Sequence, residues 1–389
     1  MKRTRSFLVS AILLAVLVGM FLTSGAARAA SSAPKIICGQ WNVVSSPDPN
    51  ALWNSLTGVA ANSSTDVWAV GNIFGNSGGL LTLAEHYDGT QWSVVSTPNP
   101  GVGAQLNEVV AISANDVWAV GNFQDSNYVS HTLVEQWNGT SWSVVPSPDG
   151  STQGAQLSGI AAISATDIWA VGNKYISGGN GKTLTEHWDG TQWSVVPSPN
   201  VKGAASDELS GVTVASSSTA WAVGTSTTGS TTSTLIEKWN GTKWKIVASP
   251  NPQNAYNQLN GVAAASSNSI WAAGYSIGNN GTQTLAEQWK NKQWNIVASP
   301  SPSAANVFLG IAASSTRDIW AVGSSGPFGS TQTLTEKWNG NKWAVVNSPT
   351  SGTLSVFNSV AVVPGTTDFW AVGNANINGV TNTLTAYYC

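Results

Sequence analysis

The chain has 389 residues, of which 9% are charged and 9% aromatic, and its formal charge is −3. This acidic balance argues against nucleic-acid binding, because phosphate backbones require basic patches. The low charge content leaves solvation to Ser, Thr, Asn and Gly, a composition typical of extracellular bacterial proteins.

The first element in chain order is a secretory signal. Basic residues at positions 2, 3 and 5 precede an apolar stretch over residues 7–22, and the small residues Ala27 and Ala29 end the segment. This pattern predicts a Sec-type signal peptide over residues 1–29 that is cleaved on export. Cleavage leaves 12 basic and 19 acidic residues, a charge of −7. No later apolar run reaches the roughly 20 residues of a membrane-spanning helix, so we expect a secreted protein without a membrane segment.

A Trp-Ala-Val-Gly tetrad, or a near-identical one, then recurs seven times. Successive spacings are 50, 51, 52, 50, 49 and 50 residues, and a period of this length indicates stacked structural repeats. The repeated Trp residues are Trp68, Trp118, Trp169, Trp221, Trp271, Trp320 and Trp370.

Each repeat predicts four short strands, which in the first repeat cover residues 56–61, 66–71, 81–87 and 91–95. Four strands per unit are typical of a propeller blade. The third and fourth strands are separated by Asp-Gly or Asn-Gly pairs such as Asp88-Gly89, which predict two-residue type I′ turns. Only Lys290-Asn291 departs from that pair.

The two ends of the mature chain complement each other. Cys389 follows a third strand and Cys38 precedes a fourth strand, so each Cys occupies a place that a turn residue holds in the other repeats. We therefore predict that the N-terminal strand closes the last blade and that a Cys38–Cys389 disulfide replaces the missing turn.

These observations predict an all-β fold, a seven-bladed β-propeller with four-stranded blades in a single domain over residues 30–389. The expected blades cover residues 50–98, 101–148, 152–199, 204–250, 254–300, 303–349, and 353–389 together with 38–47.

The blade resembles the kelch repeat of galactose-oxidase-type propellers and of secreted bacterial proteins with tandem Trp-Ala-Val-Gly repeats. The resemblance rests on Trp68 to Gly71, on the aromatic Tyr87 that ends the third strand, and on Trp92 followed by Pro98. It implies the propeller fold. Galactose oxidase itself needs histidine ligands for copper, and this chain has three His in all, so no cofactor or metal is expected.

Two series of repeated residues have a structural interpretation. The large Trp side chains are expected to fill the wedge between twisted blades rather than to stack on sugars. A Glu recurs in the third strand, and we expect it to be buried with an indole N–H or a backbone amide of the next blade as partner, a calcium site being the alternative. The Glu positions are Glu85, Glu135, Glu186, Glu237, Glu287 and Glu336.

Other polar residues invite no catalytic interpretation. His86 and His187 share a repeat position that looks exposed and variable, and Asp66 and its equivalents look like turn-capping residues. Glu108 stands where the other innermost strands have Gly or Ser, and we expect a solvated carboxylate near the central channel.

The variable loops predict the binding face. The connections between second and third strands and between blades gather on one face of a propeller, and binding residues favour such loops. Candidate ligand-binding residues there are Trp53, Tyr128, Tyr175 and Tyr275.

We expect a monomeric, non-catalytic binding or scaffold module at the cell surface, with a glycan or an extracellular protein as partner. The alternative is an extracellular polysaccharide-degrading enzyme, for which only Asp125, Asp149, Asp207 and Glu208 lie free of the repeat positions.

Overall fold

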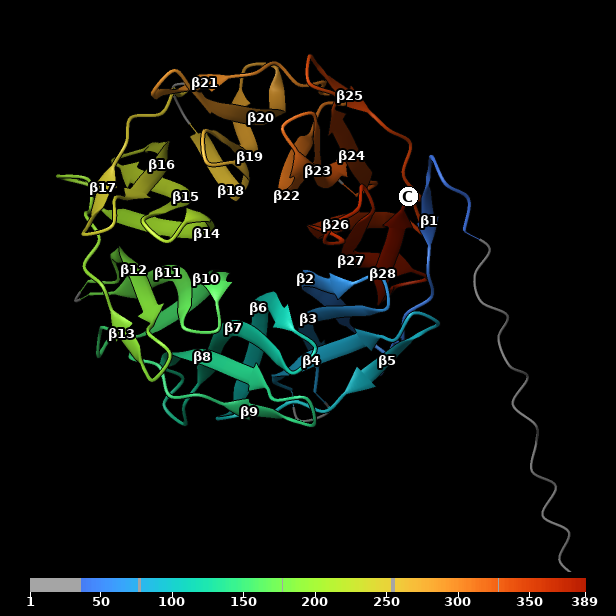
Figure 1. Ribbon diagram of the computed structural model, residues 1–389, viewed down its shortest axis with the longest axis horizontal. Coiled ribbons are helices and arrows are strands. Elements are labelled where there is room, and N and C mark those ends of the chain that lie inside the picture. Colours follow the sequence, from blue (N-terminus) through green and yellow to red (C-terminus); the bar gives the residue numbers. More distant parts are fainter. Residues whose placement is uncertain (1–35, 76–77, 177, 253–255, 328) are drawn as a thin grey trace, which may run out of the picture. The chain divides into compact units, whose positions relative to one another are not determined.

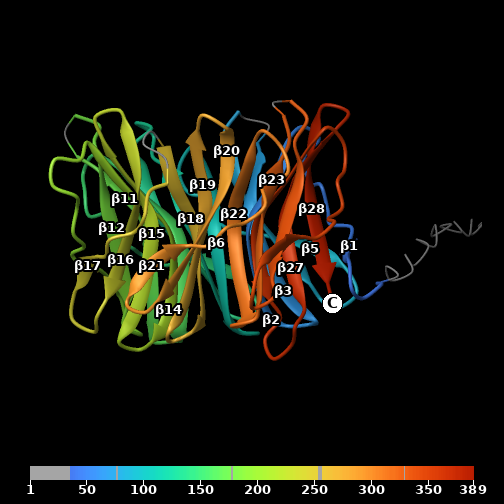
Figure 2. The ribbon, with the colours of Figure 1, turned by 90° about the horizontal axis from the view of Figure 1, so that it is seen from above.

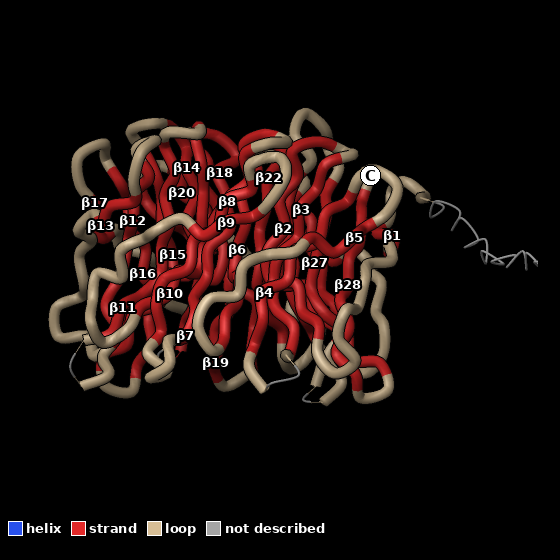
Figure 3. The backbone as a smooth tube through the Cα atoms, turned by 90° about the horizontal axis from the view of Figure 1, so that it is seen from below, coloured by secondary structure: helices blue, strands red, loops and turns tan. Residues whose placement is uncertain are grey.

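The computed structural model describes residues 36–75, 78–176, 178–252, 256–327 and 329–389, all within the compact unit Lys35–Cys389. The predicted signal peptide lies outside the described residues. The described residues form 28 strands and no helix (Figure 3), which confirms the all-β prediction. Within this part of the chain, no helix is long and apolar enough to cross a membrane.

The strands form blades of four, numbered here in chain order. Blade 1 contains β2 (Asn54–Ser63), β3 (Asp66–Phe74), β4 (Leu80–Tyr87) and β5 (Trp92–Val95); blade 2 contains β6 (Gly103–Ser113), β7 (Asp116–Gln124), β8 (Ser130–Trp137) and β9 (Trp142–Val144); blade 3 contains β10 (Ala155–Ser164), β11 (Asp167–Tyr175), β12 (Gly181–Trp188) and β13 (Trp193–Val195). Blade 4 contains β14 (Ser206–Ser216), β15 (Thr219–Thr228), β16 (Thr231–Trp239) and β17 (Trp244–Ile246); blade 5 contains β18 (Tyr256–Ser266), β19 (Ser269–Gly278), β20 (Gly281–Lys290) and β21 (Gln293–Ile296). Blade 6 contains β22 (Asn306–Ser315), β23 (Asp318–Ser325), β24 (Gln332–Trp338) and β25 (Trp343–Val345), and blade 7 contains β26 (Leu354–Val362), β27 (Phe369–Ile377), β28 (Val380–Tyr388) and β1 (Trp41–Val43).

The blades follow one another around a ring, with the first strand of each nearest the centre (Figure 1). Strands within a blade pair antiparallel, and their ends lie on the two faces of the disc (Figure 2). Blades 4 and 5 form one eight-stranded sheet through a single parallel pair, Thr232 with Tyr256, whereas the other five sheets have four strands each. This arrangement confirms the predicted propeller of four-stranded blades.

Tryptophan pairs hold neighbouring blades together. Trp68 of blade 1 is buried and packs edge-to-face on Trp142 of blade 2, with ring centroids 5.2 Å apart. Such pairs contribute about 0.5–1.5 kcal/mol beyond the burial of their area. The same geometry recurs at every interface, in Trp118–Trp193, Trp169–Trp244, Trp221–Trp294, Trp271–Trp343, Trp320–Trp41 and Trp370–Trp92.

Each innermost strand has a β-bulge, and in three blades an Asn at the bulge makes a second tie between blades near the channel. In β26 the register shifts between Phe357 and Ser359, and the Asn358 side chain donates to the Leu56 carbonyl of blade 1 at 2.7 Å. Asn107 and Asn260 make the same bond to blades 3 and 6 at 2.7 and 2.6 Å. The bulge therefore turns a side chain toward the next blade.

The ring closes through the N-terminal strand. Trp41 of β1 pairs with Tyr388 of β28, and Cys38 and Cys389 form a disulfide across 351 positions of sequence. Both predictions about closure are confirmed.

The prediction of two-residue turns between the third and fourth strands was wrong for most blades. Tyr87 pairs with Trp92, so four residues separate the strands, and Gly89 alone among them has a positive φ, of 92°. The Asp88 carboxylate accepts the N–H groups of Thr90 and Gln91 at 2.8 and 2.9 Å and stabilises this wider turn.

Blade 5, which departs from the Asp/Asn-Gly pattern, has the two-residue turn. Lys290 pairs with Gln293, and the residues between them, Asn291 and Lys292, have φ values of 56° and 63°. Positive φ at both central residues is the requirement of a type I′ turn.

Candidate functional site on the loop face

The two faces of the disc differ in their connections. One face, the turn face, has the short turns between first and second and between third and fourth strands, and Gly89 packs there against Thr65. The opposite face, the loop face, has the connections between second and third strands and between blades. The connections between second and third strands are longer in blades 1, 2, 3 and 6. In blades 4, 5 and 7 only two residues separate the paired ends of these two strands.

Two of the four predicted ligand-binding residues are well exposed on the loop face. Trp53 is 44% exposed, and its indole N–H donates to the Asn72 side chain at 3.2 Å. Tyr128 is 74% exposed and has a φ of 61°, which is unusual for a bulky residue.

The other two are partly buried. Tyr175 donates its backbone N–H to the Gly154 carbonyl at 2.8 Å. Tyr275 stacks on Tyr256 with ring centroids 5.7 Å apart, and both hydroxyls donate to Oε1 of Gln258. Burial raises the pKa of the Tyr275 hydroxyl. The four residues come from blades 1, 2, 3 and 5, and the groove that contains Tyr128 contains none of the other three.

That groove lies between blades 1 and 2 and has a volume of about 530 Å³. Gly78 and Gly79 line it together with the start of β4, and residues 99–104 line it from the connection that leads from β5 into β6. Blade 2 completes the lining with Gln105, Asn122, Gln124 and Tyr128. All its lining residues are uncharged.

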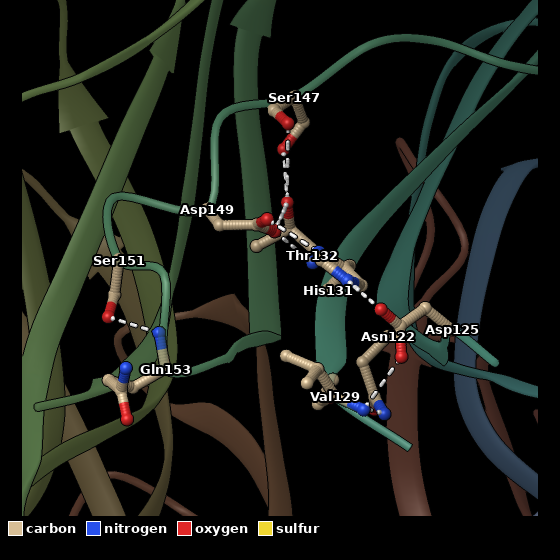
Figure 4. Close-up of polar contacts among 10 residues, drawn as sticks. Asn122, Asp125, Val129, His131, Thr132, Ser147, Asp149, Ser151 and Gln153 are labelled. Atoms are coloured by element: carbon tan, nitrogen blue, oxygen red, sulfur yellow. Dashed lines mark hydrogen bonds and ion pairs between the residues drawn. The ribbon is translucent and has the colours of Figure 1, made fainter. Parts of the chain in front are cut away.

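Beside the groove, His131 of β8 lies between two carboxylates (Figure 4). Its Nδ1 is 2.7 Å from Oδ2 of Asp149, its Nε2 is 3.6 Å from Oδ2 of Asp125, and its ring stacks on Phe123 with centroids 5.2 Å apart. The hydrogen bond with Asp149 is the largest cause that raises the pKa of His131. Because both ring nitrogens face carboxylates, neither is free to act as a base toward a ligand.

Asp149 also has a structural role that repeats around the ring. Its Oδ1 accepts the backbone N–H of Thr132 at 2.7 Å, as Asn99 does for Thr82 in blade 1. Asp149 is therefore fixed by its own blade, and the interaction with His131 is the feature peculiar to blade 2.

The remaining acids outside the repeat positions do not form a catalytic pair. Asp207 is fully buried, accepts the Val201 backbone N–H at 3.1 Å, and lies 3.9 Å from the Lys182 ammonium group. Glu208 is exposed and accepts the Ser206 hydroxyl at 3.1 Å. No group of three or more His, Cys, Asp or Glu residues suited to a metal ion occurs in the part of the chain that the structure describes.

Glu108 lies at the central channel, as expected, but it is partly buried there rather than freely solvated. Its carboxyl group lies in the central channel, in a cavity of about 170 Å³ that all seven innermost strands line, and accepts the Val109 N–H at 3.0 Å. A Cβ on Gly58 would stand 2.7 Å from Cα of Glu108, so the backbone of blade 2 approaches too closely there for a larger residue. Burial raises the pKa of Glu108 to about 8, although hydrogen bonds from Val109, Val59 and Ser359 act in the opposite direction.

The six repeated Glu residues are completely buried, but their expected partners were wrong. The Ser147 hydroxyl of blade 2 donates to Oε2 of Glu186 at 2.8 Å, and the other five carboxyl groups have no hydrogen-bond partner among the described residues. Burial raises the pKa of Glu85 and Glu237 to about 9 and that of the other four to about 8.

The exposed position assigned to His86 and His187 was also wrong. Each is half-buried on the turn side and bonds to an Asp at the start of the second strand, at 2.8 Å in both cases. Gln136 of blade 2 replaces His and donates to Asp116 at 2.9 Å. The repeated Asp thus binds the side chain at this third-strand position, whether that residue is His or Gln.

The sequence analysis missed the groove amides and the pairing of His131 with two acids. A signal was present, since blade 2 alone combines His before the third-strand Thr with acids at 125 and 149. Sequence spacing could not show that residues 18 positions apart lie 2.7 Å from each other.

The chain matches no family model and no curated protein sequence. Solved structures resemble its fold. YCF48 bound to D1 peptide is 16% identical, with 92% of this chain and 100% of that chain covered and a TM-score of 0.55. RRP9 WD40 repeats are 10% identical, with 92% and 99% covered and a TM-score of 0.56. The GH74 xyloglucanase from Xanthomonas campestris is 13% identical, with 87% and 54% covered and a TM-score of 0.53. These similarities establish the propeller fold.

Proposed function

We propose that the chain is a secreted, non-catalytic binding module whose loop face binds a glycan at the cell surface. The observation that carries this proposal is the exposed, uncharged groove on that face, with an aromatic ring at its edge and amide side chains along its wall. Sugars present hydroxyl groups and apolar C–H faces, and amides and aromatic rings complement these.

Secretion is supported by the disulfide, because such bonds persist in oxidising compartments. We further propose that residues 1–29 act as a cleaved Sec-type signal. Like the signal peptide, the resemblance to kelch repeats and the monomeric state remain predictions from the sequence.

The fold neighbours are consistent with either a glycan or a peptide as ligand. Their printed descriptions name a D1 peptide for YCF48 and a xyloglucanase activity for the Xanthomonas protein. We favour a glycan because the groove is uncharged and rich in amides. An extracellular protein is the second possible partner.

The second candidate function is polysaccharide breakdown. It is favoured by the fold similarity to the xyloglucanase. A glycosidase requires two carboxyl groups about 5–10 Å apart on either side of the substrate, whereas Asp125 and Asp149 both contact His131. Release of reducing ends from a polysaccharide that the protein binds would support this candidate over ours.

The decisive experiment is a glycan-array screen of the mature protein, followed by titration calorimetry with the glycans that bind. We expect the variant Tyr128→Ala to lose binding, because it removes the exposed aromatic ring of the groove. The turn-face variant Arg317→Ala is the matched control and should bind as the wild type does. Equal loss in both variants, or no glycan bound at all, would contradict the proposal.

A further inference from the structure

The groove between blades 1 and 2 combines features of a specific site. Glycines at 78, 79, 101 and 103 leave its backbone accessible, while Gln105, Asn122 and Gln124 supply amide groups. Asn122 donates to the Ser130 hydroxyl at 3.1 Å, but its buried Oδ1 has no partner among the described residues. A buried acceptor without a partner costs stability unless a ligand or solvent supplies a donor.

The position of Tyr128 is set by the loop between β7 and β8. Asp125 exchanges backbone hydrogen bonds with this loop, donating to the Val129 carbonyl at 3.0 Å and accepting the Tyr128 N–H at 2.9 Å. Its side chain also accepts the N–H groups of Asn127 and Val129 at 2.8 and 2.9 Å. The left-handed backbone of Tyr128 is thus maintained by Asp125, and strained residues of this kind concentrate at functional sites.

His131 connects this loop to the rigid blade. Asp149 is fixed by the backbone of β8, and His131 bridges it to Asp125 across 2.7 and 3.6 Å (Figure 4). Only the doubly protonated imidazolium ring donates from both nitrogens. A neutral ring keeps one donor, for Asp149, and turns a lone pair toward the Asp125 carboxylate.

Two other charged groups lie near Asp149. Lys174 of β11 packs against Gly150, next to Asp149, and Glu186 of β12 lies close enough to Asp149 to have its pKa raised by it. Phe123, which stacks on the ring, carries no charge. His131 and Glu186, whose pKa is about 8, both change charge near neutral pH, and His131 is the one of the two that lies against Asp125.

We propose that the groove binds a neutral oligosaccharide, that the Tyr128 ring is its stacking wall, and that protonated His131 positions this wall by bridging Asp125 and Asp149. The proposal rests on the proposed glycan-binding function. It makes His131 a positioning residue and makes binding stronger below the pKa of His131 than above it.

The bridge can be tested without a ligand. In the variant His86→Gln/His187→Gln, His131 is the only histidine, and Gln136 shows that Gln keeps the contact with the paired Asp. We expect the NMR titration of His131 to give a raised pKa, and the protection factors of the backbone amides of residues 125–130, which correct for the intrinsic pH dependence of exchange, to fall as pH rises through that pKa. The additional change His131→Gln should make these protection factors independent of pH. Protection factors that do not change with pH in the variant that keeps His131 would overturn the bridge and leave glycan binding intact.

Ligand binding is tested with cellotetraose, laminaritetraose and mannotetraose as probes, by calorimetry at pH 6 and pH 8.5. For the probe that binds, we expect Tyr128→Ala to weaken affinity at least about tenfold and Tyr128→Phe to retain most of it. Leu52→Ala, an exposed residue outside the groove, should bind as the wild type does.

The wild type should bind several-fold more weakly at pH 8.5, and His131→Gln should bind equally at both pH values. Unchanged affinity in Tyr128→Ala would overturn the groove as the site while glycan binding itself stands. Failure of the wild type to bind any probe or any array glycan would contradict both proposals.

Discussion

At the scale of single residues, the buried Glu series stands out. A carboxyl group with a pKa of about 8 or 9 is neutral at neutral pH, so these residues resemble amides more than acids. Neutrality explains how the interior tolerates six of them with a single hydrogen bond from Ser147.

These pKa values predict how stability depends on pH. Unfolded Glu ionises near 4.3, whereas folded Glu237 keeps its proton up to a pH of about 9. The folded state therefore binds more protons between these values, and stability falls as pH rises from about 4.5 to about 9, by at most about 1.4 kcal/mol per pH unit for each group. We expect a higher melting temperature at pH 5 than at pH 8.5.

The variant Glu237→Gln isolates one such group. Removing its titration should raise the melting temperature relative to the wild type at pH 8.5 and change it little at pH 5, as measured by thermal unfolding. Glu208→Gln, at an exposed position, should follow the wild type at both pH values. A lower melting temperature of Glu237→Gln at pH 8.5 would mean that this carboxyl is ionised and paired.

Residues of the repeat were predictable in place but less so in role. The spacing of Trp and Glu located both series in the core, because periodic positions in stacked blades meet equivalent neighbours. Hydrogen-bond partners could not be predicted, because they depend on which loop of the preceding blade reaches the side chain. Ser147 and Glu186 are 39 positions apart, and Asp149 and His131 meet only after β9 has paired with β8.

At the scale of elements, strands and their order followed from sequence, whereas turn geometry did not. The Asp-Gly pair suits both a two-residue turn and a wider one, and the hydrogen bonds that the Asp88 carboxylate accepts from the N–H groups of the turn decide for the wider form. Blade 5 has Lys290 in place of this acceptor and forms the tighter turn with two non-glycine residues at positive φ.

This turn offers a simple test. Lys292 has a φ of 63°, which glycine adopts without strain, so Lys292→Gly should stabilise the protein by about 0.5–1 kcal/mol. Chemical denaturation measures the change. The control is Lys342→Gly, in the wider turn of blade 6 where φ is not positive, and it should be neutral or destabilising. Equal stabilisation by both changes would contradict the assigned turn.

At the scale of the whole molecule, closure depends on two segments from opposite ends of the chain. Pairing of β1 with β28 completes the last blade, and the Trp370–Trp92 contact and the hydrogen bond from the Asn358 side chain to the Leu56 carbonyl join that blade to the first. The disulfide reinforces the same blade. Sequence predicted this closure because the missing turn residues at the two ends complement each other.

We expect Cys389→Ser to lower the melting temperature and leave the blades formed. A crosslink that spans a long loop typically contributes about 2–4 kcal/mol, while the Trp pairs and strand pairing that close the ring stay in place. Thermal unfolding measures the loss, and far-ultraviolet circular dichroism checks that strand content is unchanged. Two reactive thiols per chain in the unreduced, denatured wild type would show that the bond does not form.

The two ends of the propeller are joined at Cys38 and Cys389, so a chain that begins at another blade can form the same ring of blades. The two ends meet where every other blade has a turn, so a peptide linker could take the place of the disulfide. New termini could then be opened at an equivalent turn, such as Asn240-Gly241 in blade 4, without breaking a strand pair. The fold is thus a candidate for circular permutation, in which each blade in turn could become the one shared between the two ends.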